Sequence, residues 1–185
     1  MIRIINIIFF IIYFTATNAY SLIEIDITRG NLDPLPIAVS PLFQDDSSKK
    51  NSIDEIKIEN VGSEISSVVE NNLKMSGLFN PLNKEAFLQK PDIAHLKPRF
   101  EDWALIKAQA LITGKVTIEN KKLKVEFRLW DILAGREMMA LAFTTVPSNW
   151  RRVGHIISDK VYERLTGEKG YFDTRIIYVS EEGPK

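Results

Sequence analysis

The alternation of apolar and polar residues predicts several short strands. From Ser21 to Thr28, isoleucines alternate with Glu24 and Asp26, which is the period of a half-buried strand. A second β-type run covers Leu35 to Leu42, and its prolines favour strand ends or a sheet edge. Three more strands are predicted over residues 110–118, 123–129 and 139–145, joined by short turns.

Two longer segments have a helical period instead. Over residues 58–76, apolar side chains recur three or four positions apart, and Gly77 follows as a left-handed C-terminal cap. The same spacing over residues 148–165 predicts a second helix, with Ser148 as its N-cap and Gly167 as its stop. Because each apolar stripe needs a partner, we predict an α/β fold: a mixed sheet of about five strands with two main helices on one face.

The first nineteen residues have the pattern of a secretory signal peptide. Arg3 precedes an apolar run from Ile4 to Phe14, and small residues at Thr17 and Ala19 form a cleavage site. The alternative is a transmembrane anchor, but the run is shorter than the ~20 residues that span a bilayer. We therefore expect cleavage after Ala19 and no stable membrane insertion afterwards.

The C-terminal segment from Thr174 to Ser180 has a strong strand pattern and follows a glycine-containing linker, Gly167 to Gly170. This strand either adds an edge to the same sheet or begins a further structural unit. The pattern alone does not distinguish the two.

Composition narrows the function classes. The 185 residues include 24 basic and 24 acidic side chains, so the chain lacks the basic excess that is typical of nucleic-acid binders. Without cysteine, disulfides, thiolate chemistry and cysteine-type zinc or iron–sulfur sites are excluded. Only two histidines are present, which argues against a histidine-rich metal site.

Candidate catalytic residues are few. His155 and Asp159 lie four positions apart on the second predicted helix, so they could form a base–carboxylate dyad or an ordinary surface pair. His95 lies between Pro91 and Pro98, where a solvated loop histidine is expected rather than a ligand. The three tryptophans are interpreted as core or core-edge residues: Trp103, Trp130 and Trp150.

The run from His155 to Val179 resembles the domain junction of the TolB family of the Tol–Pal system. The matching residues are Ser158-Asp159, Leu165-Thr166-Gly167, Lys169-Gly170, Phe172, Thr174-Arg175-Ile176 and Tyr178-Val179. Upstream, Asn71 to Pro81 is similar to the end of that family's first helix, and Trp103 precedes a strand through Gly114-Lys115-Val116. The resemblance extends over nearly all of residues 1–180.

The resemblance implies an N-terminal α/β domain similar to anticodon-binding domains, followed by a six-bladed β-propeller. In the family, the segment after the signal peptide contacts TolA, and the propeller binds the lipoprotein Pal. The implied organisation is a signal peptide (1–19), a partner-binding strand and hinge (20–34), the α/β domain (35–170) and the start of a truncated propeller (171–185). The rest of the propeller is expected to be missing, as in a fragment, a truncated product or half of a split protein.

We therefore predict a periplasmic adaptor that is not an enzyme, uses no cofactor and contacts a TolA-like inner-membrane protein. A Pal-like lipoprotein is expected as a partner only if a propeller is supplied. The predicted partner-binding residues form one segment: Tyr20, Ser21, Leu22, Ile23, Glu24, Ile25, Asp26, Ile27 and Thr28. Two alternatives stay open, namely an RNA-binding module of related fold and a small exported hydrolase using His155 and Asp159.

Overall fold

The computed structural model describes residues 23, 25, 33–44 and 60–174. The predicted signal peptide, most of the predicted strand from Ser21 to Thr28, and the segment after Thr174 lie outside the described residues. The description below therefore concerns the α/β domain and the segments that contact it.

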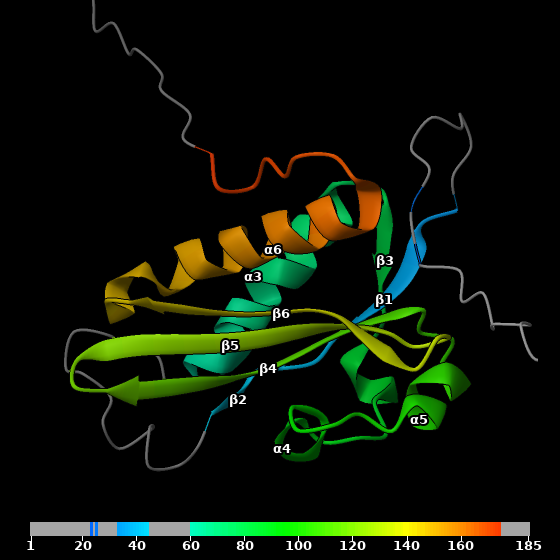
Figure 1. The fold of residues 1–185 in the computed structure, drawn as a ribbon, viewed down its shortest axis with the longest axis horizontal. Helices are drawn as coiled ribbons and strands as arrows, with labels where there is room; N and C mark the ends of the chain where they lie inside the picture. Colours follow the sequence, from blue (N-terminus) through cyan, green and yellow to red (C-terminus); the bar gives the residue numbers. More distant parts are fainter. Residues whose placement is uncertain (1–22, 24, 26–32, 45–59, 175–185) are drawn as a thin grey trace, which may run out of the picture.

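Strands of both orientations form a single mixed sheet in the order β3-β1-β4-β5-β6 (Figure 1). Its strands are β1 (Leu35–Val39), β2 (Phe43–Gln44), β3 (Phe79–Pro81), β4 (Ala110–Glu119), β5 (Lys122–Asp131) and β6 (Arg136–Thr145). Both β3 and β4 run parallel to β1, whereas β4, β5 and β6 form an antiparallel meander. The short β2 also pairs with β4, beyond the end of β1.

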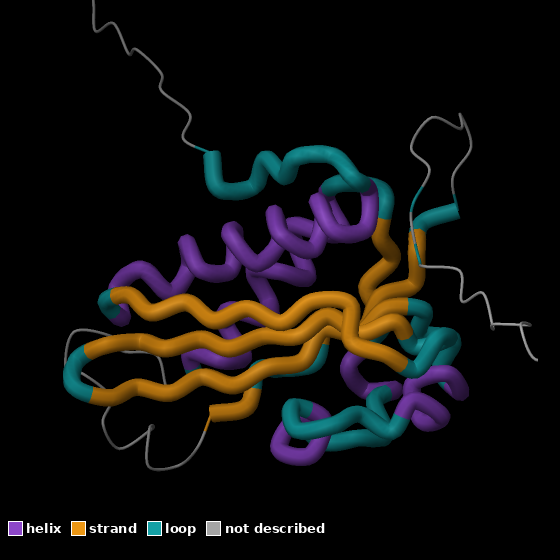
Figure 2. Tube along the Cα trace, viewed as in Figure 1, coloured by secondary structure: helices purple, strands orange, loops and turns teal. Residues whose placement is uncertain are grey.

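Helices cover the two faces of the sheet unequally (Figures 1 and 2). The long helices α3 (Val61–Met75) and α6 (Trp150–Thr166) lie on one side, and the short helices α4 (Pro91–Ala94) and α5 (Phe100–Leu105) lie on the other. The chain passes from β1 to β3 through α3, then crosses to β4 through α4 and α5. The α/β class with two main helices on one face is confirmed.

The larger core lies between the sheet and the two long helices. Fully buried side chains there include Ile37 and Phe127 from the sheet, Ile65 from α3, and Ile157 from α6. A second cluster on the other face contains Ala38, Leu111, Trp103 and Trp130. Neighbouring residues Ile37 and Ala38 enter different clusters because successive side chains of a strand point to opposite faces.

The two long helices cross closely at Gly154. A Cβ at this position would lie 2.8 Å from Val68 Cγ1, so α3 and α6 could not keep this separation with a larger residue. The approach also brings the side chains of Asn72 and Ser158 together, and Asn72 Nδ2 donates to Ser158 Oγ at 2.9 Å. A packing contact and a hydrogen bond therefore fix the position of α6 on α3.

Two predicted helix starts need correction. The first helix begins at Val61 rather than at residue 58, because Asn60 Oδ1 accepts a hydrogen bond from the Ser63 N–H at 3.0 Å and caps the helix there. The prediction of Ser148 as the second N-cap is wrong: Pro147–Asn149 form a 3₁₀ turn, and α6 begins at Trp150 without a side-chain cap bond.

Two predicted turns are confirmed by backbone angles. Gly167 ends α6 with a φ of 75°, in the left-handed region, as its predicted role as a stop requires. Asn120 and Lys121 connect β4 to β5 with φ values of 51° and 59°, so both central residues of this tight turn are left-handed.

Candidate partner-binding site

The described part of the predicted partner-binding segment docks on the end of α6. Ile25 is 9% exposed, and its backbone N–H donates to the Leu165 carbonyl oxygen at 2.7 Å. Ile23 is partly buried and packs against the larger core. Neither residue belongs to a strand of the described sheet. The contact is therefore with a helix end, and not along a sheet edge.

The other residues of the predicted segment lie outside the described part of the chain: Tyr20, Ser21, Leu22, Glu24, Asp26, Ile27 and Thr28. Asp33 and Pro34, at the end of the predicted hinge, are exposed. The assignment of partner binding to Tyr20–Thr28, and of a hinge to the turn that follows, therefore stays a prediction.

The segment after α6 folds back along the same helix. Gly170 lies so close to Asp159 that a Cβ there would collide with the Asp159 backbone. Both carboxylate oxygens of Asp159 accept backbone N–H groups from this segment, one from Phe172 at 2.7 Å and one from Asp173 at 3.1 Å. Asp159 therefore fixes the path of the chain as it leaves the helix.

Aromatic and ionic contacts extend this attachment. Tyr162 makes edge-on contacts with Tyr171 and Phe172, with ring centroids 5.5 and 5.8 Å apart. Burial is the main cause that raises the pKa of Tyr162 above its usual range. Arg152 is bonded to Asp173 at 3.1 Å, and this hydrogen bond raises the pKa of the guanidinium. Residues 171–173, which the sequence suggested as the start of another unit, thus contact α6.

The base–carboxylate dyad that was one of two interpretations of His155 and Asp159 is not assembled. Asp159 is occupied by the two backbone N–H groups of the following segment, and His155 Nδ1 lies 2.9 Å from Asn72 Nδ2 on α3. Because the amide nitrogen is a donor, this contact makes Nδ1 the acceptor, in a link between helices. Among the described residues, no group of three or more His, Cys, Asp or Glu side chains is placed to hold a metal ion.

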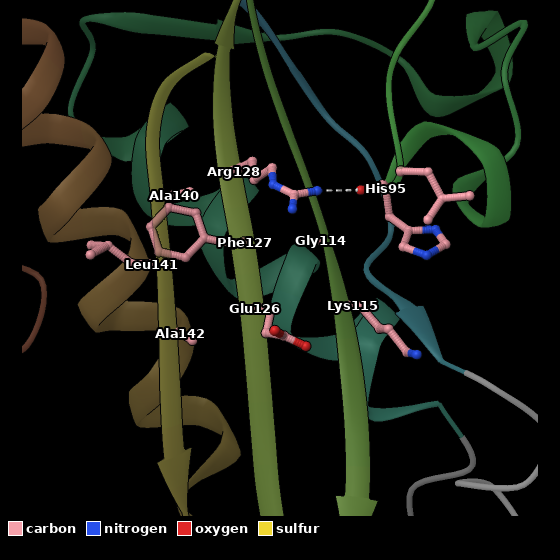
Figure 3. A pocket seen from close by; sticks show the side chains of 10 residues that line it. His95, Gly114, Lys115, Glu126, Phe127, Arg128, Ala140, Leu141 and Ala142 are labelled. Carbon is pink, nitrogen blue, oxygen red and sulfur yellow. Dashed lines mark hydrogen bonds between the residues drawn. The ribbon is translucent and has the colours of Figure 1, made fainter.

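A groove on the less covered face of the sheet was missed by sequence reasoning (Figure 3). It has a volume of about 390 Å³ and is lined by residues from β4, β5 and β6 and from the end of α4. Arg128 donates to the His95 carbonyl oxygen at 2.9 Å (Figure 3). Lys115 on β4 and Glu126 on β5 also line the groove. No local motif could reveal this groove, because pairing of distant strands creates it.

His95 differs from the expected solvated loop residue. Its ring is half-buried at the end of α4 and stacks on Phe43 with a centroid distance of 4.6 Å. Its Nδ1 lies 3.0 Å from the Pro91 carbonyl oxygen. The tryptophan interpretation is confirmed, since Trp103 and Trp130 are buried and Trp150 packs against the larger core.

The fold defines a class: a mixed α/β domain with two long helices on one face and with short segments of chain docked on the second of these helices. The model of the TolB amino-terminal domain matches residues 23–138. The chain belongs to this family. None of the helices in the described residues reaches the length and hydropathy that a membrane crossing requires.

A similar protein and a similar structure are consistent with the family assignment. Over all 185 residues, the chain is 74% identical to the Tol-Pal system protein TolB of Pelagibacter ubique (strain HTCC1062), and it spans 41% of that protein's length. The crystal structure of TolB from Acinetobacter baumannii matches with a TM-score of 0.60 and 21% identity, over 76% of this chain and 30% of that one. At this identity the structural match supports the fold alone.

Proposed function

We propose that this chain is a non-enzymatic adaptor of the Tol–Pal envelope system that acts in the periplasm after cleavage behind Ala19. Family membership and the 74% identity to a Tol-Pal system protein support the choice of system. In this proposal, Tyr20–Thr28 contacts a TolA-like inner-membrane protein, and the complex supports outer-membrane integrity and cell division. A Pal-like lipoprotein is bound only when a propeller is present.

The position of Ile25 is the observation that carries the proposal. It is attached to α6 by one backbone hydrogen bond, and the described sheet includes neither Ile23 nor Ile25. Releasing this segment breaks no strand ladder of the described residues. A freed extended segment can join the sheet edge of a partner, where main-chain bonds supply affinity and alternate side chains supply selectivity.

The cost of release is within the range that a partner can offset. Exposing the buried Ile25 side chain costs about 2 kcal/mol, its backbone hydrogen bond adds about 1 kcal/mol, and the partly buried Ile23 adds about 1 kcal/mol more. Shifting a two-state equilibrium from mostly docked to mostly released takes roughly 5.5 kcal/mol of differential affinity. The segment can therefore be docked in the free protein and released by a partner of ordinary affinity.

The test is a binding titration against the C-terminal domain of a TolA-like protein. Chains starting at Tyr20 and at Leu32 are compared, and we expect removal of residues 20–31 to abolish binding. The main thermal transition should persist, lowered by the loss of the Ile25 contact. A synthetic peptide of residues 20–31 should compete with the full chain, whereas a peptide of the same composition in scrambled order should not.

Two results would count against the assignment. Unchanged affinity after the deletion would place the binding site elsewhere, for example at the groove of Figure 3. Loss of the thermal transition would mean that the segment is needed for folding, and the peptide competition then decides whether it also binds.

A further inference from the structure

One edge of the sheet is long and lacks the usual protection of a free edge. β6 is the last strand of the sheet and has 10 residues, whereas β3 at the opposite edge has 3. Three exposed residues in the middle of β6, called the edge residues below, are Ala140, Ala142 and Thr144. Neither a charged residue nor a proline occurs from Met138 to Val146. Natural proteins block a free edge with such residues, because its backbone groups otherwise pair with another strand.

The turn between β4 and β5 determines which backbone groups of β6 face outwards. A two-residue turn with two left-handed residues is closed by a pair that exchanges backbone hydrogen bonds, here Glu119 and Lys122. Hydrogen bonds to β4 and to β6 then alternate along β5. The register therefore directs the backbone groups of Leu141 and Phe143 toward β5, and those of the edge residues away from the sheet.

The free part of this edge has defined ends. At its start, Arg164 Nε donates to the Met138 carbonyl oxygen at 3.4 Å, and the register of β5 with β6 shifts between Leu129 and Trp130. At its other end, Pro147 lacks a backbone N–H and begins a 3₁₀ turn. An added strand is therefore confined to the edge residues and their immediate neighbours, which suits a short extended segment.

The two faces beside the edge differ in character. On the α3 and α6 face, Leu141 is 37% exposed, and Phe143 is half-buried against the larger core. Apolar side chains of an added strand would extend this layer. On the other face, the groove reaches Ala140 and Ala142 at the edge (Figure 3). A long side chain of the added strand can lie over these alanines and enter the groove.

The charges of β5 on the groove face alternate in sign. The three side chains that lie opposite the edge residues in turn are Arg128, Glu126 and Lys124. They are 43–50% exposed, and their ion pairs, to Glu137 and between Lys124 and Glu126, are weak surface pairs. An added strand would lie two strand spacings, or ~10 Å, from β5, within reach of two long charged side chains. The complementary pattern is acidic, basic and acidic at alternate positions.

We propose that the edge of β6 binds an extended segment of a partner protein as a further antiparallel strand, with this charge pattern on the groove face and apolar side chains between the charges. Main-chain hydrogen bonds to the edge residues supply affinity, and the alternating charges supply selectivity. A second copy of β6 does not match, because its own residues from Met138 to Val146 are uncharged. The proposal is independent of the proposed TolA contact, so removal of residues 20–31 should leave this binding unchanged.

The test is NMR of the isotopically labelled chain, with the end-blocked peptide TVEVKVEVT as the probe. In the free chain, the amide protons of the edge residues should exchange rapidly, and those of Leu141 and Phe143 slowly. The peptide should shift the edge amides saturably and slow their exchange. The same peptide N-methylated at its lysine should not bind, because that N–H would face Ala142. The charge-reversed peptide TVKVEVKVT should bind about threefold more weakly.

Other outcomes would overturn the proposal. Slow exchange of the edge amides in the dilute free chain would show that the edge is already covered. Slowing that depends on protein concentration, without peptide, would identify a second copy as the occupant. Absence of binding, or equal binding of the N-methylated peptide, would exclude strand addition at this edge. Equal binding of the charge-reversed peptide would exclude the charge pattern.

Variants of β6 and β5 sharpen the test. Ala142→Pro removes one outward N–H at a position where an edge strand tolerates proline, so peptide binding should be lost. Ala142→Ser keeps this N–H and is the matched control, with an affinity within about twofold of the parent chain. Glu126→Lys should reverse the middle preference, so that TVEVEVEVT binds about threefold more tightly than TVEVKVEVT. An unchanged preference in Glu126→Lys, with the thermal transition retained, would refute the pairing across Ala142.

Discussion

The two faces of the sheet differ in how completely they are covered. On the α3 and α6 face, the long helices bury a continuous layer of aliphatic and aromatic side chains. On the α4 and α5 face, a small cluster around Trp103 and Trp130 covers one end of the sheet, and Lys115, Glu126 and Arg128 stay partly exposed beyond it. One face therefore carries most of the stability, while the other leaves room for the groove over β4, β5 and β6.

Substitution at the centre of the covered face tests this difference most strongly. Ile157 is 1% exposed in the middle of α6, and Ile157→Asp would bury an unpaired carboxylate between helix and sheet. We expect the variant to be unfolded at room temperature by circular dichroism. Glu126→Gln, on the open face, is the control and should melt with the parent protein. A folded Ile157→Asp protein would show that this core accommodates water.

Substitution in the smaller cluster around Trp103 should destabilise the domain strongly, but less than Ile157→Asp does. Trp103 is 1% exposed and contacts the Phe87 ring edge-on at 5.0 Å. Trp103→Ala should destabilise the domain by about 3–5 kcal/mol, measured by urea unfolding. Trp103→Phe keeps most of the apolar volume but loses the bond to Gln89, so its loss should be well below that of alanine. A loss below about 1 kcal/mol in Trp103→Ala would mean that the short helices do not form a second core.

The smallest effect is expected at the rim of the covered face. His155 is half-buried, and it is joined to Asn72 by one hydrogen bond between the helices. His155→Ala should lower stability by about 1 kcal/mol in the same urea experiment. Asn72→Ala, which also removes the bond to Ser158, should cost more. A large loss in His155→Ala would contradict its position at the rim of the helix interface.

Sequence periodicity predicted the elements better than their contacts. The stripe through Ile157 and the alternation through Phe127 correctly indicated a helix and a strand, because side-chain direction repeats with the backbone period. The pairing of β1 with both β3 and β4 was not predicted, since it joins residues distant in sequence. The same limit concealed the buried hydrogen bonds of Gln89, whose side-chain oxygen accepts from Trp103 Nε1 and from the Arg99 backbone N–H.

At the candidate partner-binding site, too, the sequence predicted the apolar segment but not its contacts. An alternating pattern located an apolar segment around Ile25, but it could not indicate that Ile25 is attached to the end of a helix. The attachment depends on the Leu165 carbonyl group, which the end of α6 leaves without a helical partner. Asp159 was weighed as a catalytic group from its spacing to His155, although its bonds to Phe172 and Asp173 give it a positioning role.

The left-handed turn at Asn120 and Lys121 has a consequence for how the sheet assembles. It joins β4 to β5 by neighbouring residues, so this hairpin closes with little loss of chain entropy and on a microsecond scale. Ile37 pairs with Ala110 across a far longer stretch of chain. Chain entropy therefore favours a kinetic order in which the meander forms before the parallel pairings of β1 with β3 and with β4.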